Sequence, residues 1–293
     1  MAVRSVAAPP LGERFEYDLG DGMRSLADSE YSRSITEAIE LTRAIGHLPD
    51  PRERAFAWEE SSVLIATMCS WTHLPAVFAD CREDLVKPPS FAEYRADDSA
   101  GIVAMRNKAV SALLSREHFT HLLMLDTDMV YPPETIQELV LADKDIVAGL
   151  ACGRVPVLGS TRSGRSPYFP NTFWKKVPEG RFLFERTAAL PTPPGLHRCG
   201  AVSFGGVLIK RKVFEGLKRP CFDNSHWQKM PSGKRARVGE DMYFQATAAE
   251  AGFEVWCDTS LHYGHLIEAA VYPEQAEDGT CGHRVSLVGC KTG

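Results

Sequence analysis

The sequence predicts an α/β domain in which a mostly parallel central sheet is flanked by helices. Three short apolar runs, residues 63–67, 121–125 and 145–151, are typical of strands buried on both faces. They alternate with two helical segments: residues 99–116 carry apolar side chains at helical spacing, and residues 132–141 begin with two prolines that suit a first helical turn. A β-α-β-α-β succession of this kind favours a parallel sheet covered by helices.

The second half of this domain has a different texture. Residues 154–194 are rich in Pro, Gly, Ser and Arg, which predicts a long loop with a small antiparallel excursion around residues 182–184. The remaining expected elements are a strand over 199–210 interrupted by two glycines, a short helix over 211–217, a helix over 238–252, and extended pieces over 253–257 and 261–265.

Three parts follow along the chain. Residues 1–60 are expected to form an N-terminal arm with one helix, residues 61–265 the main domain, and residues 266–293 a C-terminal tail. No run of about 18 apolar residues predicts a membrane span, and residues 1–22 lack the pattern of a signal peptide. Together with eight scattered cysteines, this favours a reduced, cytoplasmic location, in a bacterium or an infected host cell.

Charge is distributed unevenly. Residues 152–237 contain 17 Lys or Arg against four acidic residues, a net charge of +13, while the whole chain carries −5. A basic middle segment in an otherwise acidic chain indicates an anionic ligand, such as nucleotide phosphates, a polyanionic acceptor such as DNA, or both. A dispersed, solvated surface flanked by acids from elsewhere remains the alternative reading of the same charges.

Two acids follow a predicted buried strand directly. Asp126 and Asp128 come after the apolar run that ends at Leu125, where ligands of open α/β sheets bind. A turn after this strand would let both carboxylates converge on one hard cation, Mn²⁺ or Mg²⁺, that keeps positions open for substrate phosphates. The simpler alternative is a solvated turn.

Several other positions have a physical interpretation of the same kind. The strand at 63–67 should deliver Thr67 and Cys69 to the carboxyl edge of the sheet, where a nucleotide could be held. Gly205 and Gly206 weaken a strand unless a ligand approaches the backbone, a bulge being the alternative. Trp227, in the basic region, suits stacking on a sugar ring or a base, or the small core of a lid.

Taken in order, these motifs resemble the GT-A type nucleotide-sugar glycosyltransferases, in particular compact bacterial or phage members. The resemblance covers about residues 61–265 and is carried by Thr67, Ala104-Met105-Arg106-Asn107, Asp126-Thr127-Asp128, Gly205-Gly206, Gly239-Glu240-Asp241 and Gly264-His265. It implies a GT-A, Rossmann-like fold and a donor substrate that is a nucleotide sugar, with UDP as the expected nucleotide.

The resemblance also implies roles for individual residues. The implied metal ligands are Asp126, Asp128 and His265, with Asp126 also able to reach the ribose of the nucleotide. The implied substrate-binding residues are Thr67, Cys69, Arg106, Asn107, Asp126, Gly205, Gly206 and Trp227. The implied catalytic residues are Asp241 and Glu240 at the start of a helix, and the family pattern favours Asp241 as the base that takes the proton from the acceptor hydroxyl.

The expected function is therefore metal-dependent transfer of a sugar to a hydroxyl group. The basic middle segment makes a hydroxymethylated pyrimidine in DNA the expected acceptor, reached by flipping the base out of a duplex. Three alternatives stay open on the sequence alone: a saccharide or lipid-linked saccharide acceptor, nucleotidyl transfer, and a non-catalytic protein that binds nucleic acid or sugar.

Overall fold

A computed structural model describes most of the chain beyond residue 56. The described residues are 57–69, 74–97, 100–152, 174–176, 180–182, 184–186, 191, 193–229, 233–266, 269–275 and 281–287. The predicted N-terminal helix and most of the long loop predicted over 154–194 lie outside these residues. The division into three parts therefore stays a prediction.

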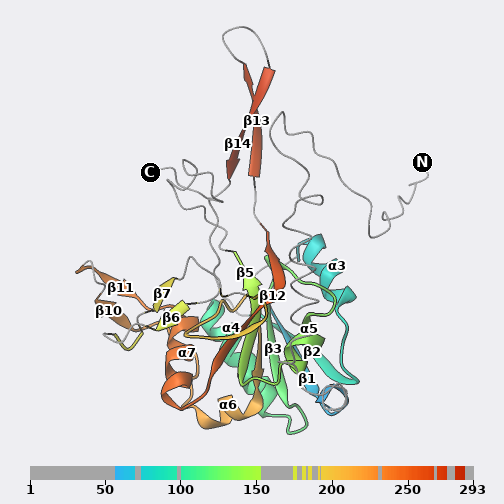
Figure 1. Ribbon diagram of the computed structural model, residues 1–293, viewed down its shortest axis with the longest axis vertical. Coiled ribbons are helices and arrows are strands. Elements are labelled where there is room, and N and C mark those ends of the chain that lie inside the picture. The colour runs from blue at the N-terminus through green and yellow to red at the C-terminus, as the bar shows by residue number, and fades with distance from the viewer. Residues whose placement is uncertain are drawn as a thin grey trace.

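A mixed eight-stranded sheet forms the body of the molecule (Figure 1). Its strands are β1 (Ser62–Met68), β2 (Ser90–Ala96), β3 (His121–Asp126), β4 (Met129–Val130), β5 (Ile146–Ala151), β8 (Leu196–Cys199), β9 (Gly206–Lys210) and β12 (Val255–His265). The spatial order is β2-β1-β3-β9-β5-β12-β4, and β8 pairs with β12.

Most strands of this sheet run in one direction. β1 is parallel to both β2 and β3, and β5 is parallel to β12. β9 lies antiparallel between β3 and β5, so these two run the same way. The predicted α/β arrangement, a mostly parallel central sheet flanked by helices, is confirmed.

Helices cover both faces of the sheet. One face packs against α4 (Ile102–Leu114), α6 (Arg211–Gly216) and α7 (Glu240–Glu250), and the other against α3 (Ala76–Asp84) and α5 (Thr135–Leu141). The alternation of side chains in β1 shows why both faces are apolar, since Leu64 and Ala66 join the first cluster while Val63 and Ile65 join the second. The helix predicted over 99–116 is α4, with Met105 and Ala109 buried as expected.

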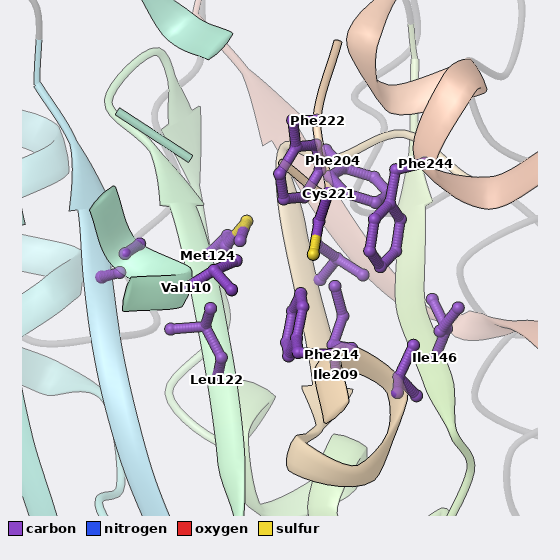
Figure 2. Close-up of a cluster of buried hydrophobic side chains, with 14 of the residues drawn as sticks. Val110, Leu122, Met124, Ile146, Phe204, Ile209, Phe214, Cys221, Phe222 and Phe244 are labelled. Atoms are coloured by element: carbon purple, nitrogen blue, oxygen red, sulfur yellow. The ribbon is translucent and has the colours of Figure 1, made fainter. Parts of the chain in front are cut away.

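A group of phenylalanines fixes α7 on the sheet (Figure 2). The Phe222 and Phe244 rings are stacked with centroids 4.7 Å apart, and Phe204 meets Phe244 edge-on at 5.5 Å. Phe244 belongs to α7, whereas Phe204 precedes β9 and Phe222 follows α6. This packing positions the start of α7, which carries Glu240 and Asp241.

The strand predicted over 199–210, with an interruption at its two glycines, forms only after the glycines: β9 covers Gly206–Lys210, whereas β8 ends at Cys199. The chain forms two strands, β8 and β9, which pair with different neighbours. β9 begins at Gly206. A Cβ at this position would lie 2.7 Å from ring atoms of both Tyr131 and Tyr263, so the close packing of the two rings requires glycine there. Conversely, the two extended pieces predicted over 253–265 form the single strand β12, whose pairing with β5 shifts register between Asp258 and His262.

Three two-stranded hairpins accompany the central sheet. The pair β6 (Trp174–Lys176) and β7 (Phe184–Arg186) is the predicted antiparallel excursion. The second pair is β10 (Trp227–Lys229) with β11 (Arg235–Arg237), and the third, in the predicted tail, is β13 (Ala269–Gln275) with β14 (Cys281–Leu287). Within the described ranges, no helix has the length and apolar character that a bilayer crossing requires.

Candidate functional site

A polar pocket of about 220 Å³ opens beyond the carboxyl end of β3. Its lining residues come from β3 and the turn after it, α4, the segment before β9, the start of α7 and the end of β12. They are Arg106, Asp126, Asp128, Met129, Ser203, Phe204, Gly205, Asp241 and His265. The site thus lies at the edge of the sheet where α/β proteins bind ligands, as the sequence predicted.

The turn after β3, formed by Asp126-Thr127-Asp128 (the acidic turn), is held by the end of β12 and by Tyr131. Met129 in β4 pairs with His265 at the end of β12, and the Leu266 amide donates to the Asp128 carbonyl over 2.8 Å. The buried Tyr131 hydroxyl contacts the carbonyl oxygens of Asp126 (3.0 Å) and Gly205. These contacts bring the acidic turn and the end of β12 together, although they are more than 130 residues apart in sequence.

Asp128 and His265 form the pair best suited to hold a cation. The His265 Nε2 and Asp128 Oδ2 atoms are 3.3 Å apart. On the other side of the ring, Nδ1 lies 2.8 Å from the Cys152 carbonyl oxygen, which can only accept a hydrogen bond. Nδ1 therefore donates to this carbonyl, and Nε2 is the ring atom that faces the Asp128 carboxylate.

The chemistry of this pair fits a divalent ion such as Mn²⁺. Adjacent ligands of an octahedral ion with bonds of about 2.1 Å are roughly 3 Å apart, close to the distance observed here. Imidazole nitrogen with carboxylate oxygen is a donor set that Mn²⁺ accepts, and such ions commonly take their remaining ligands from phosphates and water. Across the described ranges, no group of three or more His, Cys, Asp or Glu side chains is arranged as a metal site. The third predicted ligand, Asp126, points elsewhere.

Asp126 faces the buried Arg106 instead. Arg106 Nη2 is 3.6 Å from Asp126 Oδ2, and Nη1 is 2.7 Å from Glu240 Oε1. The guanidinium also lies over the ring of Phe204, 5.0 Å from its centroid. Arg106 therefore joins the acidic turn to the first residue of α7, and its side chain is only 5% exposed.

Two buried polar atoms beside this ion pair have no hydrogen-bond partner within the described part of the chain: Asp126 Oδ1 and Arg106 Nε. An unsatisfied buried carboxylate oxygen is costly, and at a pocket wall it is suited to accept a bond from a ligand hydroxyl. Burial raises the pKa of Asp126 to about 6, and the neighbouring carboxylates of Asp128 and Glu240 add to this, although Arg106 opposes the shift.

The two acids that open α7 differ in their surroundings. Glu240 is bound to Arg106, whereas Asp241 lines the pocket and accepts a bond from the Met242 amide over 2.8 Å. Burial raises the pKa of Asp241, with Arg106 opposing the shift. A carboxylate with a raised pKa binds a proton more strongly than an ordinary aspartate does.

Five of the predicted substrate-binding residues do not line this pocket: Thr67, Cys69, Asn107, Gly206 and Trp227. Thr67 and Cys69 are buried at the end of β1, and the Cys69 amide donates to the Ala96 carbonyl. The amide group of Asn107 binds both backbone groups of Phe222, so it supports the segment that carries this ring. Trp227 is on the separate hairpin β10–β11.

Three pocket residues were not singled out from the sequence: Met129, Ser203 and Phe204. Phe204 directly precedes Gly205 and Gly206, and this position in the sequence could have singled it out. The backbone at Gly206 passes close to the Tyr131 ring, which also fixes the residues just before it. Met129 follows the acidic turn, and a Cβ on Gly205 would lie 3.2 Å from its sulfur. This methionine forms part of the pocket floor.

Comparison with known proteins finds distant likenesses among solved structures. No family model matches the chain, and no curated protein does. A197 from STIV is 17% identical over 75% of this chain and 92% of that chain, with a TM-score of 0.44. GalNAc-T7, solved with UDP, GalNAc and Mn²⁺, is 14% identical over 70% of this chain and 44% of that chain, with a TM-score of 0.44. The inositol-1-phosphate CTP transferase from T. maritima is 11% identical over 71% and 89%, with a TM-score of 0.34.

Proposed function

We propose that this chain is a glycosyltransferase that moves a sugar from a nucleotide sugar, with UDP as the nucleotide, to an acceptor hydroxyl. One observation carries the proposal: a single pocket at the carboxyl edge of the sheet brings together Asp128 with His265, Arg106, and the partly buried acid Asp241. A cation-binding pair, an arginine and a base are the groups that displacement of a nucleoside diphosphate needs.

Asp128 and His265 would hold the divalent ion, Mn²⁺ or Mg²⁺. When bound, this ion supplies neutralisation of the charge that develops on the departing diphosphate. The carbonyl of Cys152 holds the His265 ring in the tautomer that leaves Nε2 available as a ligand. Asp126 Oδ1, buried and without a partner in the described part of the chain, would accept a hydrogen bond from a ribose hydroxyl of the donor.

Asp241 would act as the general base. In the proposed step the acceptor oxygen forms a bond to the anomeric carbon of the sugar, the bond from that carbon to the diphosphate oxygen breaks, and the hydroxyl proton passes to an Asp241 oxygen. A raised pKa supports this role, since the carboxylate is then the better proton acceptor. Glu240 acts differently: it holds Arg106, and through it the position of Asp126.

The acceptor that we propose is a hydroxymethylated pyrimidine base in DNA. The support is the net charge of +13 over residues 152–237 in an otherwise acidic chain. This part of the proposal is independent of the donor chemistry, and a glycan acceptor would use the same pocket.

The test of the donor chemistry is release of nucleoside diphosphate from a panel of nucleotide sugars with Mn²⁺, in the absence of any acceptor but water. We expect hydrolysis of one donor and at least a hundredfold slower release in Asp128→Ala. Asp97→Ala is the matched control, because Asp97 is an acid with a 70% exposed side chain that is not part of this pocket's lining. Release of pyrophosphate from a nucleoside triphosphate instead would identify a nucleotidyltransferase and refute the proposal.

The test of the acceptor is incubation with donor and DNA that contains hydroxymethylated cytosine or uracil. Mass spectrometry of the digested nucleosides should then show a gain of one hexose. If nucleoside diphosphate release is stimulated by a glycan and by no DNA, the acceptor is a saccharide and only the donor half of the proposal stands.

A further inference from the structure

The hairpin β10–β11 exposes an aromatic ring among basic side chains, away from the pocket lining described above. The Trp227 side chain is 56% exposed, more than any other large apolar residue in the described part of the chain. Residues 224–237 contain no acidic residue, while Lys229, Lys234, Arg235 and Arg237 are all exposed. An exposed tryptophan in such a setting indicates a binding surface.

The register of the hairpin gathers these groups on one side. Trp227 is opposite Arg237 and Lys229 is opposite Arg235, so alternation along both strands places these four side chains on the same face. Gln228 and Ala236 occupy the other face and are less exposed. Two cations directly across from each other repel, so this arrangement opposes folding of the hairpin unless an anion binds there.

The ring of Trp227 is also presented beside a cation. The guanidinium carbon of Arg235 lies 5.9 Å from the centroid of the Trp227 ring. Surfaces that bind single-stranded nucleic acid combine these two elements: aromatic rings on which bases stack, and basic groups that follow the phosphates.

The hairpin is attached firmly to the helix that begins at the pocket. The Val238 amide donates to the His226 carbonyl at the base of the hairpin, and the His226 ring stacks on Tyr243 of α7 at 4.7 Å. Arg237 precedes Asp241 by four positions, so at about 3.5 Å per residue their Cα atoms are at most about 14 Å apart. A ligand on the hairpin is therefore within reach of the pocket.

We propose that the exposed face of β10–β11, formed by Trp227, Lys229, Arg235 and Arg237, binds a single-stranded segment of the nucleic-acid acceptor next to the transferred base. The inference rests on the proposed function for the identity of this acceptor, but the binding surface exists independently of the transfer reaction. Stacking on Trp227 supplies sequence-tolerant affinity, while the basic groups make binding depend strongly on salt.

The experiment measures binding of a fluorescently labelled single-stranded oligonucleotide to the full chain by anisotropy, over a range of salt concentrations. Trp227→Ala should weaken binding roughly tenfold. Lys229→Ser with Arg235→Ser should weaken it further and make the slope of log K against log salt shallower by about 1.4, since each phosphate contact contributes about 0.7. Circular dichroism establishes that each variant is folded.

The matched control removes two positive charges elsewhere. Arg116 and Lys218 are both exposed and lie outside the hairpin, so Arg116→Ser with Lys218→Ser gives the same change in net charge. This variant should bind the oligonucleotide as the unmodified protein does. Equal losses in the control and hairpin variants would refute the proposal, because net charge alone would then explain the affinity.

Two further outcomes separate this inference from the proposed function. If the protein hydrolyses a nucleotide sugar but binds an acidic polysaccharide and no oligonucleotide, the hairpin proposal is refuted and the transferase stands. If the oligonucleotide binds through the hairpin face but no nucleotide sugar is turned over, the hairpin proposal stands and the transferase is refuted.

Discussion

Arg106 is the residue on which the geometry of the pocket depends most. Its guanidinium, between Asp126 and Glu240, is the only positive charge among the residues that line the pocket in the described structure, apart from any charge on His265. Because it is buried, its carboxylate partners are partly shielded from water, and removing it would leave them without compensation.

We expect Arg106→Met to lower the free energy of unfolding by about 1–3 kcal/mol, because it leaves two partly buried carboxylates, Asp126 and Glu240, without their cation. Urea denaturation measures this difference. Arg198→Met is the control: Arg198 also pairs with a glutamate, Glu254, but its side chain is 66% exposed, and such pairs contribute under about 1 kcal/mol. Equal effects in both variants would contradict the account of the pocket.

Asp126 gives the metal-free protein a specific pH dependence. Its pKa of about 6, raised by burial from an ordinary 3.8, means that the folded state holds a proton more tightly than the unfolded chain. The free energy of unfolding should therefore fall as pH rises from about 4 to about 6. His121, whose pKa burial lowers to about 4, contributes the opposite slope, since its unfolded form binds the extra proton.

The comparison with Asp126→Asn isolates the first contribution. Urea denaturation with a chelator present, at pH 4.5 and at pH 6.5, should show a more positive slope of stability with pH in this variant than in the unmodified protein. Identical slopes would show that the Asp126 carboxyl has an ordinary pKa in the folded state.

At this scale, the resemblance to GT-A glycosyltransferases implied Asp126, Asp128, Asp241, Arg106 and His265 as site residues, and all five side chains line one pocket. The sequence could not divide their roles. Which acid faces Arg106 depends on how α4 and α7 pack, and this packing is set by phenylalanines distant in sequence.

At the scale of the element, the start of β9 shows how a glycine can serve packing. Tyr131 and Tyr263 meet edge-on with ring centroids 5.2 Å apart, and both rings lie against Gly206. The Tyr263 hydroxyl also accepts a bond from the Gly149 amide over 3.0 Å. These tyrosines support the turn that carries Asp128, since Tyr131 follows that turn directly.

Gly206→Ala should destabilise the protein by about 1–3 kcal/mol, because its methyl group would lie 2.7 Å from atoms of both rings in a well-packed core. Thermal unfolding measures the effect. In Gly264→Ala the nearest atom, Val130 Cβ, is 3.3 Å away, so a smaller loss is expected in this control. An equal or greater loss in the control would contradict the packing explanation.

Elements with strong apolar periodicity were predictable, and those without it were not. β1, β3 and β5 form where their apolar runs predict them, because each buries its side chains between two layers, and α4 forms where its apolar stripe predicts a helix with one buried face. β2 is an edge strand that pairs only with β1; Ala92, Tyr94 and Ala96 face the first apolar cluster while the residues between them are exposed, so its apolar alternation is short and rests mainly on small side chains. The two glycines within 199–210 indicated an interruption of that strand, but its cause, the close approach of Tyr131 and Tyr263 to Gly206, depends on other elements that local sequence cannot reveal.

At the scale of the whole molecule, the structure joins an acidic pocket to a basic hairpin. The pocket is lined by Asp126, Asp128 and Asp241, whereas the exposed face of β10–β11 carries only positive charge. A divalent cation in the pocket would neutralise its acidic lining and allow two anionic substrates, donor and acceptor, to meet at the start of α7.

We expect Mn²⁺ and UDP together to raise the melting temperature of the protein more than the sum of their separate effects. Each ligand completes the site of the other, and binding to the folded state alone stabilises it by about 2.7 kcal/mol at a concentration of 100 Kd. A calorimetric scan with each ligand alone and with both measures this. Purely additive shifts would indicate separate sites.

The central claim is that Asp128 and His265 hold a divalent ion for a nucleotide. Titration of Mn²⁺ followed by electron paramagnetic resonance, with UDP present, tests it most directly in unmodified protein, Asp128→Ala, His265→Ala and the control Asp97→Ala. We predict one bound Mn²⁺ in the unmodified protein and in the control, with affinity at least tenfold weaker in the two pocket variants. Equal Mn²⁺ affinity in all four proteins would contradict the account.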